Sequence, residues 1–192
     1  IKIARNDGND PIYSSEEIKE MVKHTIPLNF EEVTDITPDV RMTLYNSGHI
    51  LGSAMVHLHV GNGLHNFLYT ADMKYGKSVL LNPAHTKFPR LESMMMEATY
   101  GGRDNILPSK QEVREYFLTV LKDTIKRKGK VLIPVLGSGR AQDIMVLLEE
   151  FVRNKEIEPF DVYIDGMVWD ITAIHTAYPE FLNTAIRKQI FH

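Results

Sequence analysis

The sequence predicts an α/β protein, because a β-rich first half is followed by a second half in which short apolar runs alternate with helical patterns. Residues 41–45 and 55–60 alternate apolar and polar side chains, as half-buried strands do. Asn62-Gly63 is a strong hairpin signal before a returning strand at 64–70. In the second half, the alternation of strand and helix is typical of a doubly wound parallel sheet.

Two further elements are expected in the first half. Ser14 or Ser15 can cap a helix that continues to Val22, with acidic residues at its positive N-terminal end. A strand at 93–97 contains Met94-Met95-Met96, which is most simply interpreted as core.

The pattern changes at Gly101-Gly102, which predicts one part at residues 1–100 and a second part at 101–192. The second part begins with a helix at Ser109 that ends in the basic cluster Lys126-Arg127-Lys128. The next expected elements are a buried strand at 130–135, a helix carrying Ile144, Leu147, Leu148 and Phe151, a strand at 161–166, and a helix from Asp170 to Tyr178.

Composition limits the function classes. The chain has no cysteine, which excludes disulfide frameworks and thiolate metal sites and fits a reducing cytoplasm. No apolar run approaches the roughly 20 residues needed to span a bilayer, so no membrane partner is expected. A net charge of −3 gives no global basic field, so any nucleic acid must bind a local patch. Because the chain begins at Ile1 without methionine and ends at His192 without a turn signal, we expect an internal fragment.

One histidine and one aspartate are candidate metal ligands. His49 lies in a glycine-flanked loop between two strands, and Asp72, 23 residues further on, lies just past the end of a strand. Side chains that strand-end loops of one sheet deliver together suit a divalent ion such as Zn²⁺. On spacing alone, one His and one Asp are more often structural, so both interpretations stay open.

Three motifs resemble the metallo-β-lactamase/β-CASP nucleases, in particular the archaeal homologues of the cleavage and polyadenylation specificity factor nuclease. Gly48-His49-Ile50-Leu51-Gly52-Ser53-Ala54 is similar to the third metal-binding motif, and Tyr69-Thr70-Ala71-Asp72 to the fourth. Glu97-Ala98-Thr99-Tyr100-Gly101 is similar to the first β-CASP motif. The resemblance implies part of an αββα sandwich followed by a doubly wound β-CASP domain. It also implies that His49 is a zinc ligand, Asp72 a ligand bridging two zinc ions, and Glu97 a catalytic-site carboxylate that orients a neighbouring histidine.

Two departures from the family pattern are present. Ala71 stands where the family usually has glycine, before the bridging aspartate. The main His-x-His-x-Asp-His motif is missing, and so are the two later histidine motifs. His57-Leu58-His59 does not replace the first, because a hairpin turn follows it, so we interpret these histidines as structural and facing solvent or the sheet edge. His192 and His175 are also interpreted as structural.

Two basic features could contact RNA. Ser138, Gly139 and Arg140 join an expected strand to a helix N-terminus, where backbone N–H groups favour an anion such as an RNA phosphate. The alternative is a βα turn whose glycines only permit close packing. The Lys126-Arg127-Lys128 cluster with Lys130 fits the dipole at a helix C-terminus better than an RNA contact.

The resemblance implies a parent enzyme that hydrolyses single-stranded RNA with two zinc ions as an endonuclease, and it leaves a second, 5′-to-3′ exonuclease activity open. The fragment alone holds two ligands where zinc needs at least three, so we expect it to be inactive as a nuclease. The alternatives are a non-catalytic RNA-binding scaffold of the same fold and a hydrolase of small esters or lactams. The sequence leaves open RNA against DNA and whether the parent forms a homodimer.

Overall fold

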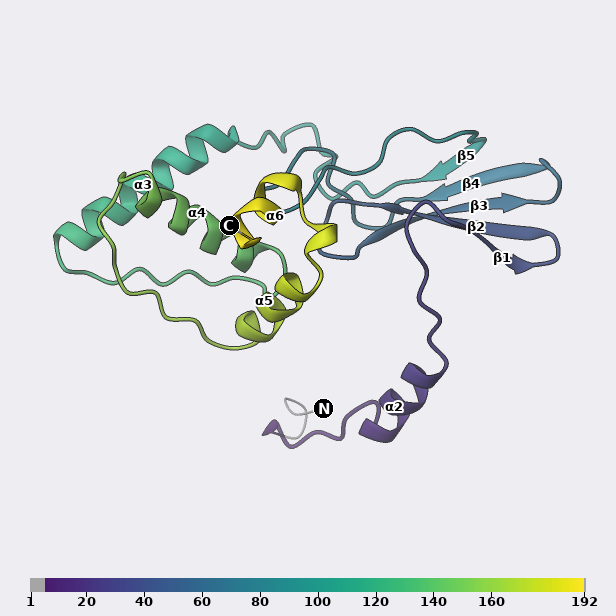
Figure 1. Cartoon of the computed structure of the whole chain (residues 1–192), viewed down its shortest axis with the longest axis horizontal. Coiled ribbons are helices and arrows are strands. Elements are labelled where there is room, and N and C mark those ends of the chain that lie inside the picture. The colour runs from purple at the N-terminus through teal and green to yellow at the C-terminus, as the bar shows by residue number, and fades with distance from the viewer. Residues whose placement is uncertain (1–5, 192) are drawn as a thin grey trace.

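The computed structural model describes residues 6–191 and confirms the α/β class. One mixed sheet of five strands has the order β1-β2-β3-β4-β5. Its first four strands pair antiparallel, and β4 pairs parallel with β5. In Figure 1 the sheet lies at one end of the molecule and the helices α3 to α6 lie at the other. The strands are β1 Val33–Thr37, β2 Val40–Asn46, β3 Ala54–Val60, β4 His65–Tyr69 and β5 Ser93–Met95.

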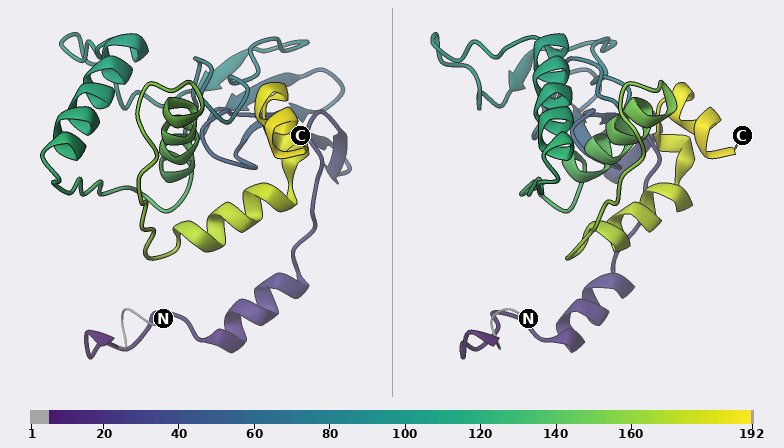
Figure 2. Two further views of the ribbon diagram at one scale, coloured as in Figure 1. Left: turned by 60° about the vertical axis from the view of Figure 1, so that its left-hand side comes forward. Right: turned by 90° about the vertical axis from the view of Figure 1, so that its left-hand side faces the viewer.

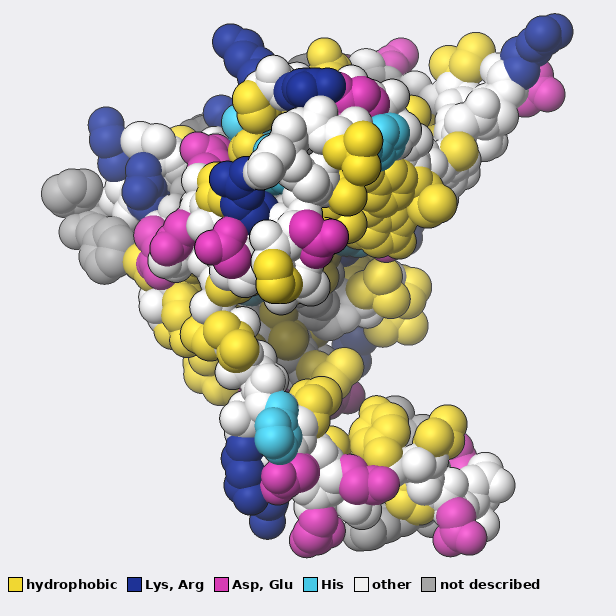
Figure 3. Space-filling view, turned by 90° about the vertical axis from the view of Figure 1, so that its right-hand side faces the viewer, with side chains coloured by type: hydrophobic (Ala, Val, Ile, Leu, Met, Phe, Trp, Pro, Cys, Tyr) yellow, Lys and Arg dark blue, Asp and Glu magenta, His cyan; other side chains and the backbone are white. Residues whose placement is uncertain are grey.

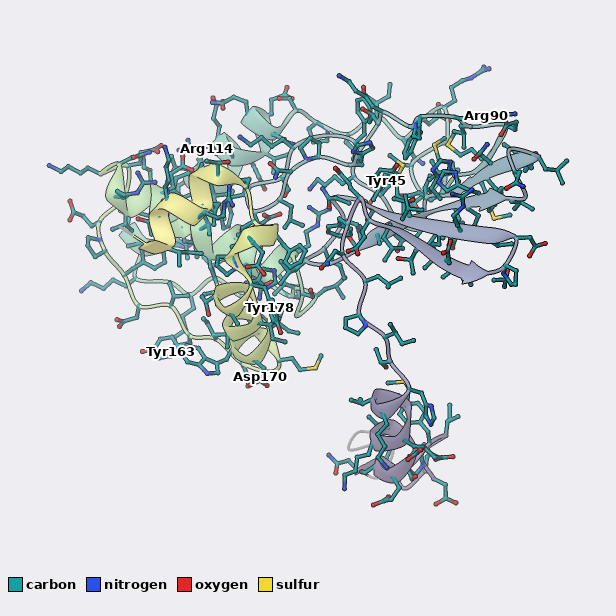
Figure 4. All side chains as sticks on the ribbon, turned by 45° about the vertical axis from the view of Figure 1, so that its right-hand side comes forward. Tyr45, Arg90, Arg114, Tyr163, Asp170 and Tyr178 are labelled. Atoms are coloured by element: carbon teal, nitrogen blue, oxygen red, sulfur yellow. The ribbon has the colours of Figure 1, made fainter. Side chains whose placement is uncertain are left out.

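The expected hairpin is present, since β3 and β4 pair across the turn that contains Asn62-Gly63. One face of the sheet carries the core residues Tyr45, Met55 and Leu68. Ala84, Met73 and Phe88 from the long connection between β4 and β5 pack on that face. In Figure 4, Tyr45 lies where the sheet meets the helical part, and Arg90 lies near the far end of the sheet.

The strand histidines do not face solvent as expected. His57 is fully buried on the core face, and its Nε2 lies 2.9 Å from the Arg90 carbonyl oxygen, to which it donates. Burial lowers the pKa of His57, and the adjacent His59 lowers it further. His57 is therefore an uncharged core side chain at neutral pH. Its role is structural, as predicted, but it packs in the core and does not face solvent or the sheet edge.

Four α-helices and one short 3₁₀ helix form the helical part, seen from two further sides in Figure 2. Phe151 is its most buried large side chain and packs with Leu121, Leu148 and Ile157. Both ends of the first helix were predicted correctly, because Ser109 caps it and the basic residues follow its last turn. The elements are α3 Lys110–Lys126, α4 Arg140–Arg153, α5 Val168–Ala177, η1 Pro179–Phe181 and α6 Thr184–Phe191.

The parallel sheet expected after residue 101 is not formed within residues 6–191. Segment 130–135 was predicted as a buried strand and segment 161–166 as a strand, but neither pairs with a strand. Leu132 is 91% exposed and Tyr163 is 90% exposed. Apolar sequence alone does not make a strand, because its backbone N–H and C=O groups need a neighbouring strand as partner.

Other element predictions also need correction. Met94-Met95-Met96 is exposed and is not core, because β5 is an edge strand. Neither β1 nor α6 was predicted, since Val33–Thr37 and Thr184–Phe191 carry weak periodic signals. The expectations for Ile1 and His192 fall outside the described residues.

The N-terminal helix α2, Ser15–Lys23, agrees with the prediction. The Ser14 hydroxyl accepts a hydrogen bond from the Glu17 N–H at 3.2 Å, and the Ser14 N–H donates to the Glu17 carboxylate at 2.6 Å, which makes a capping box. The helix lies apart from the rest of the chain in Figure 1, and hydrophobic side chains are exposed on it and on the sheet end of the molecule in Figure 3. Within the described part of the chain, no helix is long and apolar enough to cross a bilayer.

Candidate functional site

The loop that carries His49 is a compact turn between β2 and β3. The Ser53 hydroxyl lies 2.8 Å from the Ser47 hydroxyl, 3.1 Å from the Ile50 N–H and 2.7 Å from the Ile50 carbonyl oxygen. The Gly48 N–H donates to the Asn46 side-chain oxygen at 2.9 Å. These short-range bonds fix the backbone on both sides of His49, so the sequence Ser-Gly-His-Ile-Leu-Gly-Ser specifies a rigid loop rather than a mobile one.

Two hydrogen bonds join this loop to the segment that follows Asp72, and a third closes that segment on itself. The Lys74 N–H donates to the Ser47 carbonyl at 2.8 Å, the Ala84 N–H donates to the Lys74 carbonyl at 2.9 Å, and the His85 N–H donates to the Asn46 carbonyl at 2.9 Å. As a result, His49 Nε2 lies 3.8 Å from Asp72 Oδ2. The structure therefore brings the two predicted metal ligands together.

The pair fits two ligands of one zinc ion. In a tetrahedral zinc site, bonds of about 2.0–2.2 Å place two ligand atoms ~3.4 Å apart, and the observed 3.8 Å is close to that separation. Both side chains are accessible, with 43% of His49 and 69% of Asp72 exposed. However, residues 6–191 contain no cluster of three or more candidate ligands. The donor chemistry fits zinc, but the ligand set among these residues is incomplete.

Glu97 lies in the same site and holds the backbone beside Asp72. Its carboxylate accepts hydrogen bonds from the Met73 N–H at 3.0 Å and the Thr99 N–H at 3.2 Å, while its own N–H donates to the Thr70 hydroxyl at 3.2 Å. Hydrogen bonding by Thr99, then by the Met73 N–H, lowers the pKa of Glu97, and the charge of His49 adds to this. Two of the observed hydrogen-bond partners of Glu97, Met73 and Thr70, thus flank Asp72.

The residue before Asp72 adopts an unusual backbone conformation. Ala71 has φ +47°, in the left-handed region that costs a residue with a Cβ about 1–2 kcal/mol. Glycine adopts this conformation without that cost, which gives a physical reason why related sequences usually have glycine at this position.

We expect Ala71→Gly to raise the free energy of unfolding by about 0.5–1 kcal/mol. The change relieves the left-handed strain, and the greater freedom of glycine in the unfolded chain offsets part of the gain. Chemical denaturation of both proteins measures the difference. The matched control is Ala98→Gly, at a residue outside the positive-φ set, which should be neutral or destabilising. Equal destabilisation by both changes would show that Ala71 is not strained.

The Gly137-Ser138-Gly139 loop meets the His49 loop. A Cβ on Gly139, which has φ +82°, would lie 3.2 Å from Ile50 Cγ2, so the two loops are in contact. The Gly139 N–H donates to Gln142 Oε1 at 2.8 Å, and Gln142 Nε2 donates to the Gly137 carbonyl at 3.1 Å. The Gly139 N–H is therefore already bonded within the chain, and the predicted phosphate contact depends on Ser138 and Arg140.

Gln142 is a residue that the sequence analysis missed. Its side chain is buried and holds the loop closed, and it also donates to Thr172 Oγ1 at 3.1 Å in α5. The available signal was its place three residues after Gly139, the spacing at which a glutamine side chain bonds back to a helix N-terminus.

The remaining candidates lie away from the site. Lys126 is in the last turn of α3 and Arg127 caps its end, as the dipole interpretation requires. His175 is buried, and its Nδ1 donates to the Ile171 carbonyl at 2.8 Å, which supports a structural role.

The sheet, the helices and the paired His49 and Asp72 define part of an α/β protein with a metallo-β-lactamase-like fold. The chain is homologous over its whole length to archaeal proteins named transcription termination factor FttA. It is 54% identical to the Pyrococcus horikoshii protein, 52% to that of Thermococcus kodakarensis and 50% to that of Methanocaldococcus jannaschii. All of this chain is aligned, but it spans only 29–30% of the length of these relatives. No family model matches the sequence.

Proposed function

We propose that this chain is a segment of a two-zinc ribonuclease of the β-CASP type, which cleaves single-stranded RNA in connection with transcription termination. The observation that carries the proposal is the approach of His49 and Asp72 to 3.8 Å in loops that are bonded to each other. The name of the relatives, transcription termination factor, supports a role at the end of transcription, where nascent RNA is available as a substrate.

Within this proposal each residue has a definite task. Bound zinc lowers the pKa of water to about 7 and neutralises charge on the phosphate oxygens. His49 and Asp72 would supply two of its ligands. Glu97 is a positioning residue, because its bonds to the Met73 and Thr99 N–H groups hold the Asp72 loop in place.

Under this proposal, the ligands missing among residues 6–191 come from other parts of the parent polypeptide. A zinc site needs at least three protein ligands, and an enzyme of this kind places a general acid opposite the attacking water. The relatives are more than three times as long as this chain, so they have the length to supply these groups. A non-catalytic RNA-binding scaffold remains the second candidate, favoured by the incomplete ligand cluster of the described residues.

We expect the isolated chain to bind zinc weakly and to leave labelled RNA intact. The same segment, extended by the sequences that flank it in its gene, should retain about two zinc ions and cleave the RNA. Zinc content is measured by elemental analysis and cleavage by gel electrophoresis. Replacing Asp72 by alanine in the extended protein should abolish cleavage, whereas Glu158→Gln, at an exposed and distant carboxylate, should not.

The outcomes separate the two candidate functions. Tight zinc binding and cleavage by the isolated chain would overturn the claim that its site is incomplete. RNA binding by the extended protein without zinc or cleavage would instead establish the scaffold.

A further inference from the structure

His57 lies in a cluster of rings on the core face of the sheet. Its ring centroid is 4.3 Å from that of His59, 5.8 Å from that of Phe88 and 6.0 Å from that of Tyr45. Phe88 belongs to the connection between β4 and β5, which packs on this face of the sheet. We call residues 84–92 of that connection the covering segment. The ring cluster therefore joins the covering segment to the sheet.

His57 also holds the covering segment by a hydrogen bond. Its Nε2–H donates to the Arg90 carbonyl at 2.9 Å. Two backbone hydrogen bonds attach the segment near its two ends. The His85 N–H donates to a carbonyl of β2 at 2.9 Å, and the Glu92 N–H donates to a carbonyl of β4 at 3.0 Å. The His57 side chain is thus a contact of the covering segment between these two attachments.

The other ring nitrogen of His57 has no partner. Within residues 6–191, His57 Nδ1 is one of two buried side-chain nitrogen or oxygen atoms that make no hydrogen bond. Because Nε2 carries the hydrogen, Nδ1 of the neutral ring presents only a lone pair. A proton on Nδ1 would create a charged N–H donor without an acceptor in a fully buried side chain. The closed structure therefore accepts only the neutral form of His57.

The charged groups nearest to His57 act in both directions. Burial is the largest effect and lowers the pKa of His57, and His59 on the same strand lowers it further. The bond to Arg90 and the charge of Glu92 raise this pKa by less. Hydrogen bonding from the Asn66 side chain is the main reason that the pKa of Glu92 falls to about 2, so the charge of Glu92 is constant above pH 4.

The neighbouring strands add no further charge next to His57. On β2, burial raises the pKa of Tyr45, which therefore stays uncharged in this range. On β4, the residue paired with His57 is Leu68. His85, the other histidine of the covering segment, stacks on Tyr45 with ring centroids 4.5 Å apart and so lies one ring further away. The state of His57 is consequently decided by whether the covering segment is closed over it.

We propose that His57 is an acid-sensitive latch, which holds the covering segment on the sheet while it is neutral and releases the segment when it takes up a proton. In the opened state the imidazole is in water and becomes protonated as the pH falls below about 6.5. In the closed state it stays neutral to a lower pH. Closure is therefore fully stabilised above pH 6.5. Below that pH, the opening equilibrium rises by up to about tenfold per pH unit until the pKa of the closed state is reached.

The test measures opening of the covering segment by amide hydrogen exchange with mass spectrometry. The protein, extended by its flanking sequences, is kept in a chelating buffer so that no bound metal contributes. The His85 and Glu92 amides report opening, after division by the exchange rate of an unstructured peptide at the same pH. We expect opening in the original protein to rise about tenfold, or somewhat less, between pH 6.5 and 5.5.

Two variants control the measurement. His57→Gln can still donate from Nε2 to the Arg90 carbonyl but does not titrate, so its opening should change less than about twofold over the same range. His24→Gln removes a histidine whose side chain is 78% exposed at the end of α2, and it should keep the pH dependence of the original protein. Circular dichroism confirms that both variants are folded.

Three results would overturn the inference. The first is opening of the original protein that does not change between pH 6.5 and 5.5, and the second is an equal rise in His57→Gln. The third needs no variant and applies even if His57→Gln fails to fold. Deuterium exchange at the ring Cε1–H of each histidine, read by tandem mass spectrometry, gives its titration in the original protein. His57 should still be mostly neutral at pH 6.5, and half-protonation at or above that pH would exclude the latch.

Discussion

Replacing Gly48 by alanine is expected to lower the free energy of unfolding by about 3 kcal/mol. Gly48 has φ +68°, which costs any other residue about 1–2 kcal/mol. An added Cβ would also lie 2.8 Å from the Ala84 N, 2.9 Å from the Asn82 O and 3.0 Å from the Lys74 O. These are backbone atoms that cannot rotate away, so the overpacking adds about 1–3 kcal/mol. A fall of roughly 6–12 °C in the melting temperature should be observed.

The change has a functional consequence as well as a thermal one. The backbone atoms that the new Cβ would meet belong to the segment bonded to the His49 loop, so the two loops must separate. His49 and Asp72 would then move apart, and zinc content of the extended protein should fall in parallel with stability.

Gly52→Ala is the matched control for Gly48→Ala. Gly52 is in the same loop and has φ +76°, but nothing lies within 4 Å of its Cβ position. The control therefore carries the backbone strain without the clash and should cost about 1–2 kcal/mol. If the two variants melt at the same temperature, the close packing of the two loops is not a source of stability.

The second large effect is expected for Phe151→Ala, which should lower the free energy of unfolding by about 3–5 kcal/mol. Phe151 belongs to α4 and is fully buried. Its ring centroid lies 6.2 Å from that of Phe117 on α3. The Arg114 guanidinium carbon lies 4.7 Å from the Phe151 ring centroid, and Arg114 also pairs with Glu150 at 3.2 Å. Truncation leaves a cavity and removes the cation–π contact. Arg114 is labelled on the helical part in Figure 4.

Chemical denaturation, followed by circular dichroism, measures the change for Phe151→Ala. Leu132→Ala is the matched control, because Leu132 is also a large apolar side chain of the second half but is 91% exposed. It should alter stability by less than about 0.5 kcal/mol. A large effect at Leu132 together with a small one at Phe151 would mean that segment 130–135 is packed as a core strand in solution.

The sequence predicted those elements whose signals are local. Ser14 and Ser109 cap their helices, and Asn62-Gly63 turns the β3–β4 hairpin, because a cap or a turn is decided by the residues within it. Segments 130–135 and 161–166 were predicted as strands from their apolar residues, but they form no strand in the described structure. A strand depends on a neighbour distant in sequence, which its own residues do not specify.

For the candidate site, too, the sequence determined which residues are candidates and the tertiary structure determined how they are arranged. The residue types and spacing of the sequence alone identified His49 and Asp72 as candidates, and the resemblance added Glu97 and predicted the roles of all three. Only the tertiary structure decided that His49 lies 3.8 Å from Asp72 and that Glu97 bonds to the Asp72 loop. The physical reason is that these relations depend on long-range backbone hydrogen bonds, such as that from Lys74 to Ser47, which require both segments to be in place at once.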